Sequence, residues 1–158
     1  MFLGLAAAVL VAIADQLSKI WVLRFFAARP DQPPYAEQTS FFNLVLTGNR
    51  GMSFGLFNNN ATMNAIVFTV LATAIVIALI VWMRRAKTQL MRLALGLVIG
   101  GAIGNVIDRI YLGAVVDFLD FHLGDWHWFA FNLADAAICI GVGCLLIDGL
   151  LGPKEMPK

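Results

Sequence analysis

The stretch AIVFTVLATAIVIALIVWM, residues 65–83, contains no charged side chain. Roughly 20 helical residues are enough to cross the hydrocarbon core of a bilayer. The composition of the whole 158-residue chain agrees with this pattern, because 60% of its residues are hydrophobic and 13% are charged, whereas a soluble domain carries about 25% charged residues. The sequence therefore predicts a membrane protein.

Three other stretches, on either side of this one, are also long and apolar enough to span a bilayer. No basic residue precedes Lys19, unlike the basic start of a cleavable signal peptide, so we expect the first apolar stretch to be retained as a helix. We interpret residues 1–158 as a single integral membrane domain, an all-α bundle of four transmembrane helices with a small outward-facing β-rich segment. The expected spans are about 3–23, 64–83, 90–110 and 133–151.

The direction of the spans follows from the basic residues. The connection 84–92 contains four basic residues and no acidic one. Loops rich in Lys and Arg remain cytoplasmic, so we expect this connection and both termini to be cytoplasmic. The connections 24–63 and 111–132 then face outward. Trp21, Trp82, Trp126 and Trp128 fall at the expected interfaces, where aromatic side chains are enriched.

The long outward connection is rich in β-formers interrupted by glycine, as in FFNLVLTGNRGMSFGLF at 41–57. This pattern predicts a hairpin or small sheet within about 38–60. The second outward connection alternates partly over 111–130 and is expected to add strands or an interfacial segment.

Two aspartates, Asp117 in GAVVDF and Asp135 in FNLAD, are expected at the same outer rim. A carboxylate near lipid is costly, and two at one depth can share a proton, as acid/base catalysis requires. Asp148 lies 13 residues beyond Asp135, about 20 Å deeper along a helix, and cannot join the pair. Further polar residues are predicted in the same outer half of the membrane: Asp15, Lys19, Asn105, Asp108, Arg109 and Asn132.

Spacing alone leaves structural roles open for these residues. Asp15 and Lys19 are four positions apart and can form a buried ion pair, and Asp108 with Arg109 can be a pair that stabilises the bundle. A small proton-coupled transporter would use intramembrane carboxylates as a relay, and an assembly protein would use them to hold helices together. The glycines at 96, 100, 101 and 104 predict close helix packing.

Other kinds of site are disfavoured. His122 and His127 match no metal-ligand spacing, so no metal is expected, and a net charge of +1 without a basic aromatic cluster argues against nucleic acid. Cys139 and Cys144 lie in an apolar run and are expected to be buried free thiols.

Five ordered blocks resemble the lipoprotein signal peptidases, or signal peptidases II, the aspartyl membrane proteases of bacteria. Together they cover nearly the whole chain. The blocks are DQLSK at 15–19, NRGMSFG at 49–55, GGAIGNVIDR at 100–109, GAVVDF at 113–118 and FNLAD at 131–135.

The resemblance implies an aspartic endopeptidase that cleaves the signal peptide from a prolipoprotein immediately before a diacylglyceryl-modified cysteine. It places the catalytic pair on Asp117 and Asp135 and implies no metal or cofactor. The expected partners are the prolipoprotein and membrane lipid, for a monomeric multi-pass protein of the bacterial inner membrane whose active site faces outward. The resemblance gives supporting roles to Asn49, Asn105, Asp108, Arg109, Asn132, Asp15 and Lys19.

Overall fold

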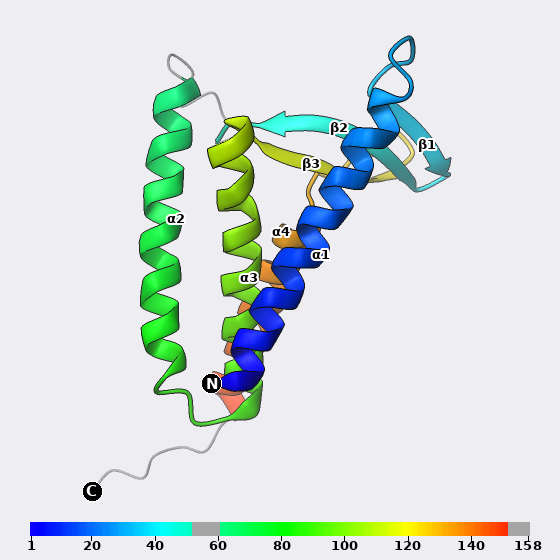
Figure 1. Cartoon of the computed structure of the whole chain (residues 1–158). Helices are drawn as coiled ribbons and strands as arrows, with labels where there is room; N and C mark the ends of the chain where they lie inside the picture. The colour runs from blue at the N-terminus through cyan, green and yellow to red at the C-terminus, as the bar shows by residue number, and fades with distance from the viewer. Residues whose placement is uncertain (52–60, 152–158) are drawn as a thin grey trace, which may run out of the picture.

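The computed structural model describes residues 1–51 and 61–151 (Figure 1). Over these residues four helices form one bundle, and each is long and apolar enough to cross a membrane. Each helix overlaps one expected span, so the predicted four-helix bundle is confirmed. The helices are α1 (Phe2–Ala27), α2 (Ala61–Met83), α3 (Gln89–Leu112) and α4 (Leu133–Leu151).

Helix α3 is the central helix and packs against α1, α2 and α4. Figure 1 shows α1 crossing α3 at an incline while α2 stands on the other side of it. The glycines of α3 allow this packing, because a Cβ at Gly96 or Gly100 would clash with the backbone of α1. A Cβ at Gly101 would clash with α4 at the carbonyl oxygen of Ala134. The predicted role of these glycines in close packing is confirmed.

Local signals define both ends of α3. Thr88 caps its start, accepting a hydrogen bond from the backbone N–H of Met91 over 2.9 Å. The Thr88 hydroxyl also donates to Asp148 Oδ1 over 2.6 Å, which connects the start of α3 to the last turns of α4. Gly113 ends the helix at φ 72°, a left-handed conformation that glycine adopts without strain.

A four-stranded antiparallel sheet lies at one end of the bundle (Figure 1), in the order β1 (Tyr35–Thr39), β2 (Phe42–Asn49), β3 (Val115–Leu123), β4 (Trp126–His127). Its apolar side chains pack on the last turns of α1. We call this end of the bundle the sheet end and the opposite end, where the N-terminus lies, the terminal end. The joining cluster contains Val22, Phe26, Leu44, Val116 and Phe118.

Some details differ from expectation. Helix α1 continues one turn beyond residue 23, because Phe26 still packs against the sheet. The sheet begins at Tyr35, before the expected segment at 38, and residues 52–60 of that segment lie outside the described residues. The region 111–130 supplies β3 and β4. The expectation of buried thiols was wrong for Cys139, which is exposed on α4, and Cys144 is only half-buried.

Candidate active site

The two aspartates Asp117 and Asp135 come together at the sheet end. Asp117 lies on β3 and Asp135 in the first turn of α4. The side chain of Asn132 joins them: its amide Nδ2 donates to Asp117 Oδ1 over 2.7 Å, and its Oδ1 accepts from the backbone N–H of Asp135 over 2.9 Å. One buried amide therefore holds both aspartates.

The contact between Asn132 and Asp135 is reciprocal, because the backbone N–H of Asn132 donates to Asp135 Oδ2 over 3.3 Å. This is a capping box, in which the residue before a helix and the residue three positions later satisfy each other's backbone groups. The motif FNLAD thus starts α4 and orients the Asp135 carboxylate in the same local structure. The positive end of the α4 dipole also favours negative charge at this position.

Asp117 is almost completely buried, with 2% of its surface exposed. Burial raises the pKa of its carboxyl from 3.8 to about 6. The hydrogen bonds from Asn49 and Asn132 oppose that rise, and the negative charge of Asp135 adds to it. Asn49, the last residue of β2, donates from Nδ2 to Asp117 Oδ2 over 3.0 Å. Asp117 therefore holds a proton to higher pH than an exposed aspartate does.

Asp135 receives a second amide from α3. Asn105 Nδ2 donates to Asp135 Oδ1 over 2.8 Å, while Asn105 Oδ1 accepts from Lys19 Nζ over 3.0 Å and from Asn132 Nδ2 over 3.2 Å. Because two donors face the amide oxygen, the amide nitrogen must face Asp135. Lys19 thus acts on Asp135 through the orientation of Asn105.

Lys19 is the centre of a buried ion triad. Its Nζ lies 2.8 Å from Asp15 Oδ2 and 2.8 Å from Asp108 Oδ2, and all three side chains are almost fully buried. The predicted Asp15–Lys19 pair is confirmed. The predicted Asp108–Arg109 pair was wrong, because the fold brings Lys19 of α1 to Asp108 and Asp108 has its carboxylate turned toward that helix.

The triad also holds the two elements that carry the aspartates. Asp15 Oδ1 accepts from the backbone N–H of Ala134, in the first turn of α4, over 3.0 Å. Asp108 Oδ2 accepts from the backbone N–H of Val116, next to Asp117, over 3.0 Å. Burying three charges costs free energy. A buried ion triad is therefore expected where it fixes the positions of the elements around it rather than where it adds stability.

Two residues of this network, Gln16 and Gly104, were not predicted as site residues from the spacing of polar residues in the sequence. Gln16 Nε2 donates to Asp108 Oδ1 over 2.9 Å and to the carbonyl oxygen of Gly104 over 3.1 Å. Gly104 lies against Asp15, and a Cβ there would clash with Asp15 Oδ2. The only sequence signal for Gln16 was its place inside the DQLSK block, since glutamine carries no charge to mark it.

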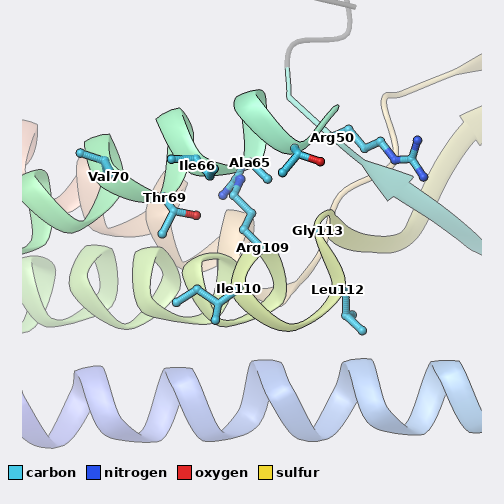
Figure 2. A pocket seen from close by; sticks show the side chains of 10 residues that line it. Arg50, Ala65, Ile66, Thr69, Val70, Arg109, Ile110, Leu112 and Gly113 are labelled. Atoms are coloured by element: carbon cyan, nitrogen blue, oxygen red, sulfur yellow. The ribbon is translucent and has the colours of Figure 1, made fainter. Parts of the chain in front are cut away.

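Arg109 lies beside this network. Its Nη1 donates to the carbonyl oxygen of Asn105 over 3.4 Å, and its guanidinium lies 5.6 Å from the centre of the Phe68 ring of α2. Figure 2 shows the side chain rising from α3 toward Ala65 of α2. It lines a cleft of about 520 Å³ between these helices, with the aliphatic residues Ile66, Val70, Ile110 and Leu112 and the hydroxyls of Thr62 and Thr69.

The two histidines form a separate cluster away from the aspartate pair. Their rings stack with centroids 4.9 Å apart, and His127 Nδ1 lies 2.8 Å from Asp120 Oδ2. Within residues 1–51 and 61–151, no three His, Cys, Asp or Glu side chains converge as metal ligands.

All the candidate residues named from the sequence thus meet at the sheet end, in one hydrogen-bonded neighbourhood that joins α1, β2, α3, β3 and α4. Four helices of membrane-spanning character and an amide-bridged pair of aspartates at one end of them define a membrane protein with a preorganised polar site.

Comparison with known proteins places the chain within that class. The profile of the family "Signal peptidase (SPase) II" matches residues 7–151. A lipoprotein signal peptidase of Rhodopseudomonas palustris strain TIE-1 is 44% identical over 155 residues, covering 95% of this chain and 93% of the relative. One of Burkholderia multivorans is 46% identical over 150 residues, covering 92% and 86%.

Solved structures of bacterial membrane enzymes share the fold of this chain. A bacterial membrane enzyme superposes with a TM-score of 0.76 at 28% identity, over 98% of this chain and 93% of the other. A second such structure gives 0.75 at 29% identity, over 96% and 94%. The chain belongs to the signal peptidase II family, and is a bacterial membrane hydrolase.

Proposed function

We propose that this protein is an aspartic endopeptidase that removes the signal peptide from diacylglyceryl-modified prolipoproteins, cutting immediately before the lipidated cysteine. The family assignment and relatives named lipoprotein signal peptidase support the substrate class. The observation that carries the chemistry is the Asn132 amide, which holds Asp117 and Asp135 in one polar site.

In the proposed reaction, the ionised carboxylate takes a proton from a water molecule, which attacks the scissile carbonyl carbon. The other carboxyl, protonated, donates its proton to the carbonyl oxygen, which gives a tetrahedral intermediate. The first carboxyl, which now holds the proton from water, then protonates the leaving amine nitrogen, and a hydroxyl of the intermediate returns a proton to the second carboxyl. The C–N bond breaks, and the products are a free signal-peptide carboxylate and a new amino terminus on the lipidated cysteine. No metal or other cofactor takes part.

We assign the proton-holding role in the substrate complex to Asp117. Burial already raises its pKa to about 6, and a substrate that expels water raises it further. Asp135 lies at the amino end of α4, where the backbone N–H of Asn132 donates to its carboxylate, and we assign it the role of the base. Both roles describe the pair in the substrate complex.

The other polar residues position this pair. Asn49, Asn105 and Asn132 orient the carboxylates directly, and Lys19, Asp15 and Asp108 hold the elements that carry them. Arg109, whose side chain lines the α2–α3 cleft, is placed to bind carbonyl groups of the substrate.

The protein is proposed to act as a monomer in the bacterial inner membrane, with lipid and the prolipoprotein as its partners. The basic connection between α2 and α3 lies at the terminal end, so the positive-inside rule places that end and both termini in the cytoplasm. The sheet end and the aspartate pair then face outward, where the modified cysteine of the substrate emerges.

The test replaces each aspartate with its amide. Asp117→Asn and Asp135→Asn, purified and shown by cooperative thermal unfolding to be folded at the assay temperature, are each expected to cleave a diacylglyceryl-modified prolipoprotein at least about 100-fold more slowly, because general acid–base catalysis contributes about 10²–10⁴ in rate. Asp31→Asn, an exposed acid in the turn after α1, is the matched control and keeps full activity. Normal turnover in either dyad variant would disprove the assignment.

A proton-coupled transporter is the competing function for the same carboxylates. A relay needs ionisable groups through the full depth of the bundle, whereas in the described chain the buried charged side chains gather at the sheet end. Proton flux into liposomes that is lost in Asp117→Asn, without any peptidase activity in the parent protein, would favour the transporter.

A further inference from the structure

The β3–β4 hairpin and the chain leading from it to α4 expose a row of large apolar side chains. We call this row, Phe121, Leu123, Trp126, Trp128 and Phe129, the aromatic edge. Leu123 is 80% exposed and Phe129 is 70% exposed. Contiguous apolar surface of this kind is unfavourable in water and marks a contact with a protein or a membrane.

The side chains of the aromatic edge pack against one another in a defined arrangement. The Trp126 and Trp128 rings meet edge to face at 5.7 Å, and Phe121 stacks with Phe131 at 5.9 Å. Together with Phe41 these side chains line a groove of about 410 Å³. The indole N–H groups give the surface a polar component beside its apolar bulk, which is the character of side chains at a bilayer interface.

A polar chain across all four strands holds the hairpin in place. The Tyr35 hydroxyl donates to Asn43 Oδ1 over 3.0 Å, and Asn43 Nδ2 donates to Asp120 Oδ2 over 2.8 Å. His127 of β4 completes the chain by donating to the same Asp120 oxygen over 2.8 Å. Although burial favours the neutral acid, the hydrogen bonds from Asn43 and His127 hold the pKa of Asp120 below its ordinary value. An ionised Asp120 therefore fixes β4, which contains Trp126 and directly precedes Trp128, to the sheet.

Chain connectivity restricts the level of the aromatic edge. The backbone of Phe131 forms hydrogen bonds with Leu119 of β3. The next residue, Asn132, caps the start of α4. Trp128 precedes Leu133, the first residue of α4, by five positions, so extended chain allows a separation of at most about 17 Å. Because α4 is one of the helices that can cross a membrane, Trp128 lies within about 17 Å of the first residue of a membrane-spanning helix.

The charge of this region indicates which kind of lipid surface fits. From Ile110 to Leu151 the sequence has no Lys or Arg, and the hairpin turn carries the exposed acid Asp125. A surface that bound anionic headgroups would carry basic residues. The contact is therefore apolar and independent of anionic lipid.

We propose that the aromatic edge is a membrane-interface surface, which inserts its tryptophans into the headgroup–acyl boundary of the leaflet at the sheet end and takes neutral phospholipid in its groove. Contact with the leaflet would hold the sheet, and with it Asp117 of β3, at a constant level in the membrane. The inference rests on the membrane-spanning fold and does not depend on the peptidase chemistry.

The experiment uses the full chain in vesicles of zwitterionic phosphatidylcholine. The variant Trp21→Phe/Trp82→Phe keeps Trp126 and Trp128 as the fluorescent reporters, and Trp126→Phe/Trp128→Phe is the matched control that reports from α1 and α2. Acyl chains brominated near the headgroup are expected to quench the hairpin tryptophans, while iodide in the aqueous phase does not. Adding anionic phosphatidylglycerol is expected to leave the bromolipid quenching unchanged.

Two results would overturn the inference. Quenching by iodide without quenching by bromolipid would place the edge in water, and protection from both quenchers would indicate a protein contact, either a second copy of this chain or another partner. Peptidase assays on the same samples separate this inference from the proposed function, because a hairpin quenched by bromolipid in a protein without activity would refute only the latter.

Discussion

Asn132 illustrates how one side chain can organise a site. Its oxygen starts α4, its nitrogen holds Asp117, and its backbone N–H donates to Asp135. The local pattern Asn-x-x-Asp is a recognisable helix-start signal. The contact with Asp117, from a strand 15 positions earlier, requires the assembled fold.

At this scale the raised pKa of Asp117 predicts a pH dependence of stability. A carboxyl whose pKa is higher in the folded protein than in the unfolded chain stabilises the fold when protonated, so its contribution is complete below about pH 4 and is lost as the pH rises through about 6. The difference between 3.8 and about 6 corresponds to about 3 kcal/mol.

Thermal unfolding in detergent should therefore show Asp117→Asn gaining stability relative to the parent protein as the pH is raised from 4 to 7. Comparing the two proteins at each pH cancels the titration of the other groups. Unfolding curves whose separation does not change with pH would contradict the assignment of a raised pKa to Asp117.

At the scale of the elements, the small residues of α3 set how near the other helices come. Gly96 and Gly100 allow α1 to approach, and Gly101 allows α4. This spacing brings Lys19 of α1 within reach of Asp108 and Asn105 of α3. The polar site therefore depends on apolar packing along the whole helix.

Gly104→Ala tests this dependence. The added Cβ would clash with Asp15 Oδ2 and press α1 away from α3. We expect a loss of about 1–3 kcal/mol, as for overpacked cores, together with reduced cleavage because the ion triad is displaced. Thermal unfolding in detergent and the cleavage rate measure the two effects.

The matched control is Gly143→Ala in α4, where a Cβ would have no neighbour within 4 Å. Alanine is favoured over glycine inside a helix by roughly 0.5–1 kcal/mol, so this variant should be as stable as the parent protein or slightly more so. Equal destabilisation by both substitutions would show that close packing at Gly104 has no special importance.

At the scale of the whole molecule, the two ends of the bundle carry different groups. The sheet end holds the aspartate pair, the ion triad and the aromatic edge, and the terminal end holds the basic connection between α2 and α3. Figure 1 shows the sheet extending from the end of α3 across to the last turns of α1. This arrangement places the aspartate pair at one end of the bundle rather than at its centre.

The proposed orientation can be measured by cysteine labelling in cells. With Cys139 and Cys144 replaced by alanine, Asp31→Cys at the sheet end should react with a membrane-impermeant maleimide from the outer side of the inner membrane. Arg85→Cys, in the basic connection, should react only after the membrane is opened. The opposite pattern would contradict the positive-inside assignment.

Much of this architecture could be predicted because lipid imposes strong constraints on sequence. Each span had to be apolar over about 20 residues, so the four helices were identified with small errors at their ends. The aspartates stood out because charge is rare in such a chain. Gln16 and the Tyr35–Asn43–Asp120–His127 chain were missed, because glutamine carries no charge and because a contact such as Asn43–Asp120 joins positions 77 residues apart.

The sequence by itself determined the number of spans, the capping box at the start of α4 and the small residues that let helices approach, because these depend on hydrophobic length, local hydrogen bonding and side-chain volume. The tertiary structure alone decided which partners the charges take. Lys19 pairs with Asp108 rather than leaving it to Arg109, and Asn132 reaches Asp117, because buried charges and amides are satisfied by whichever elements packing brings within about 3 Å.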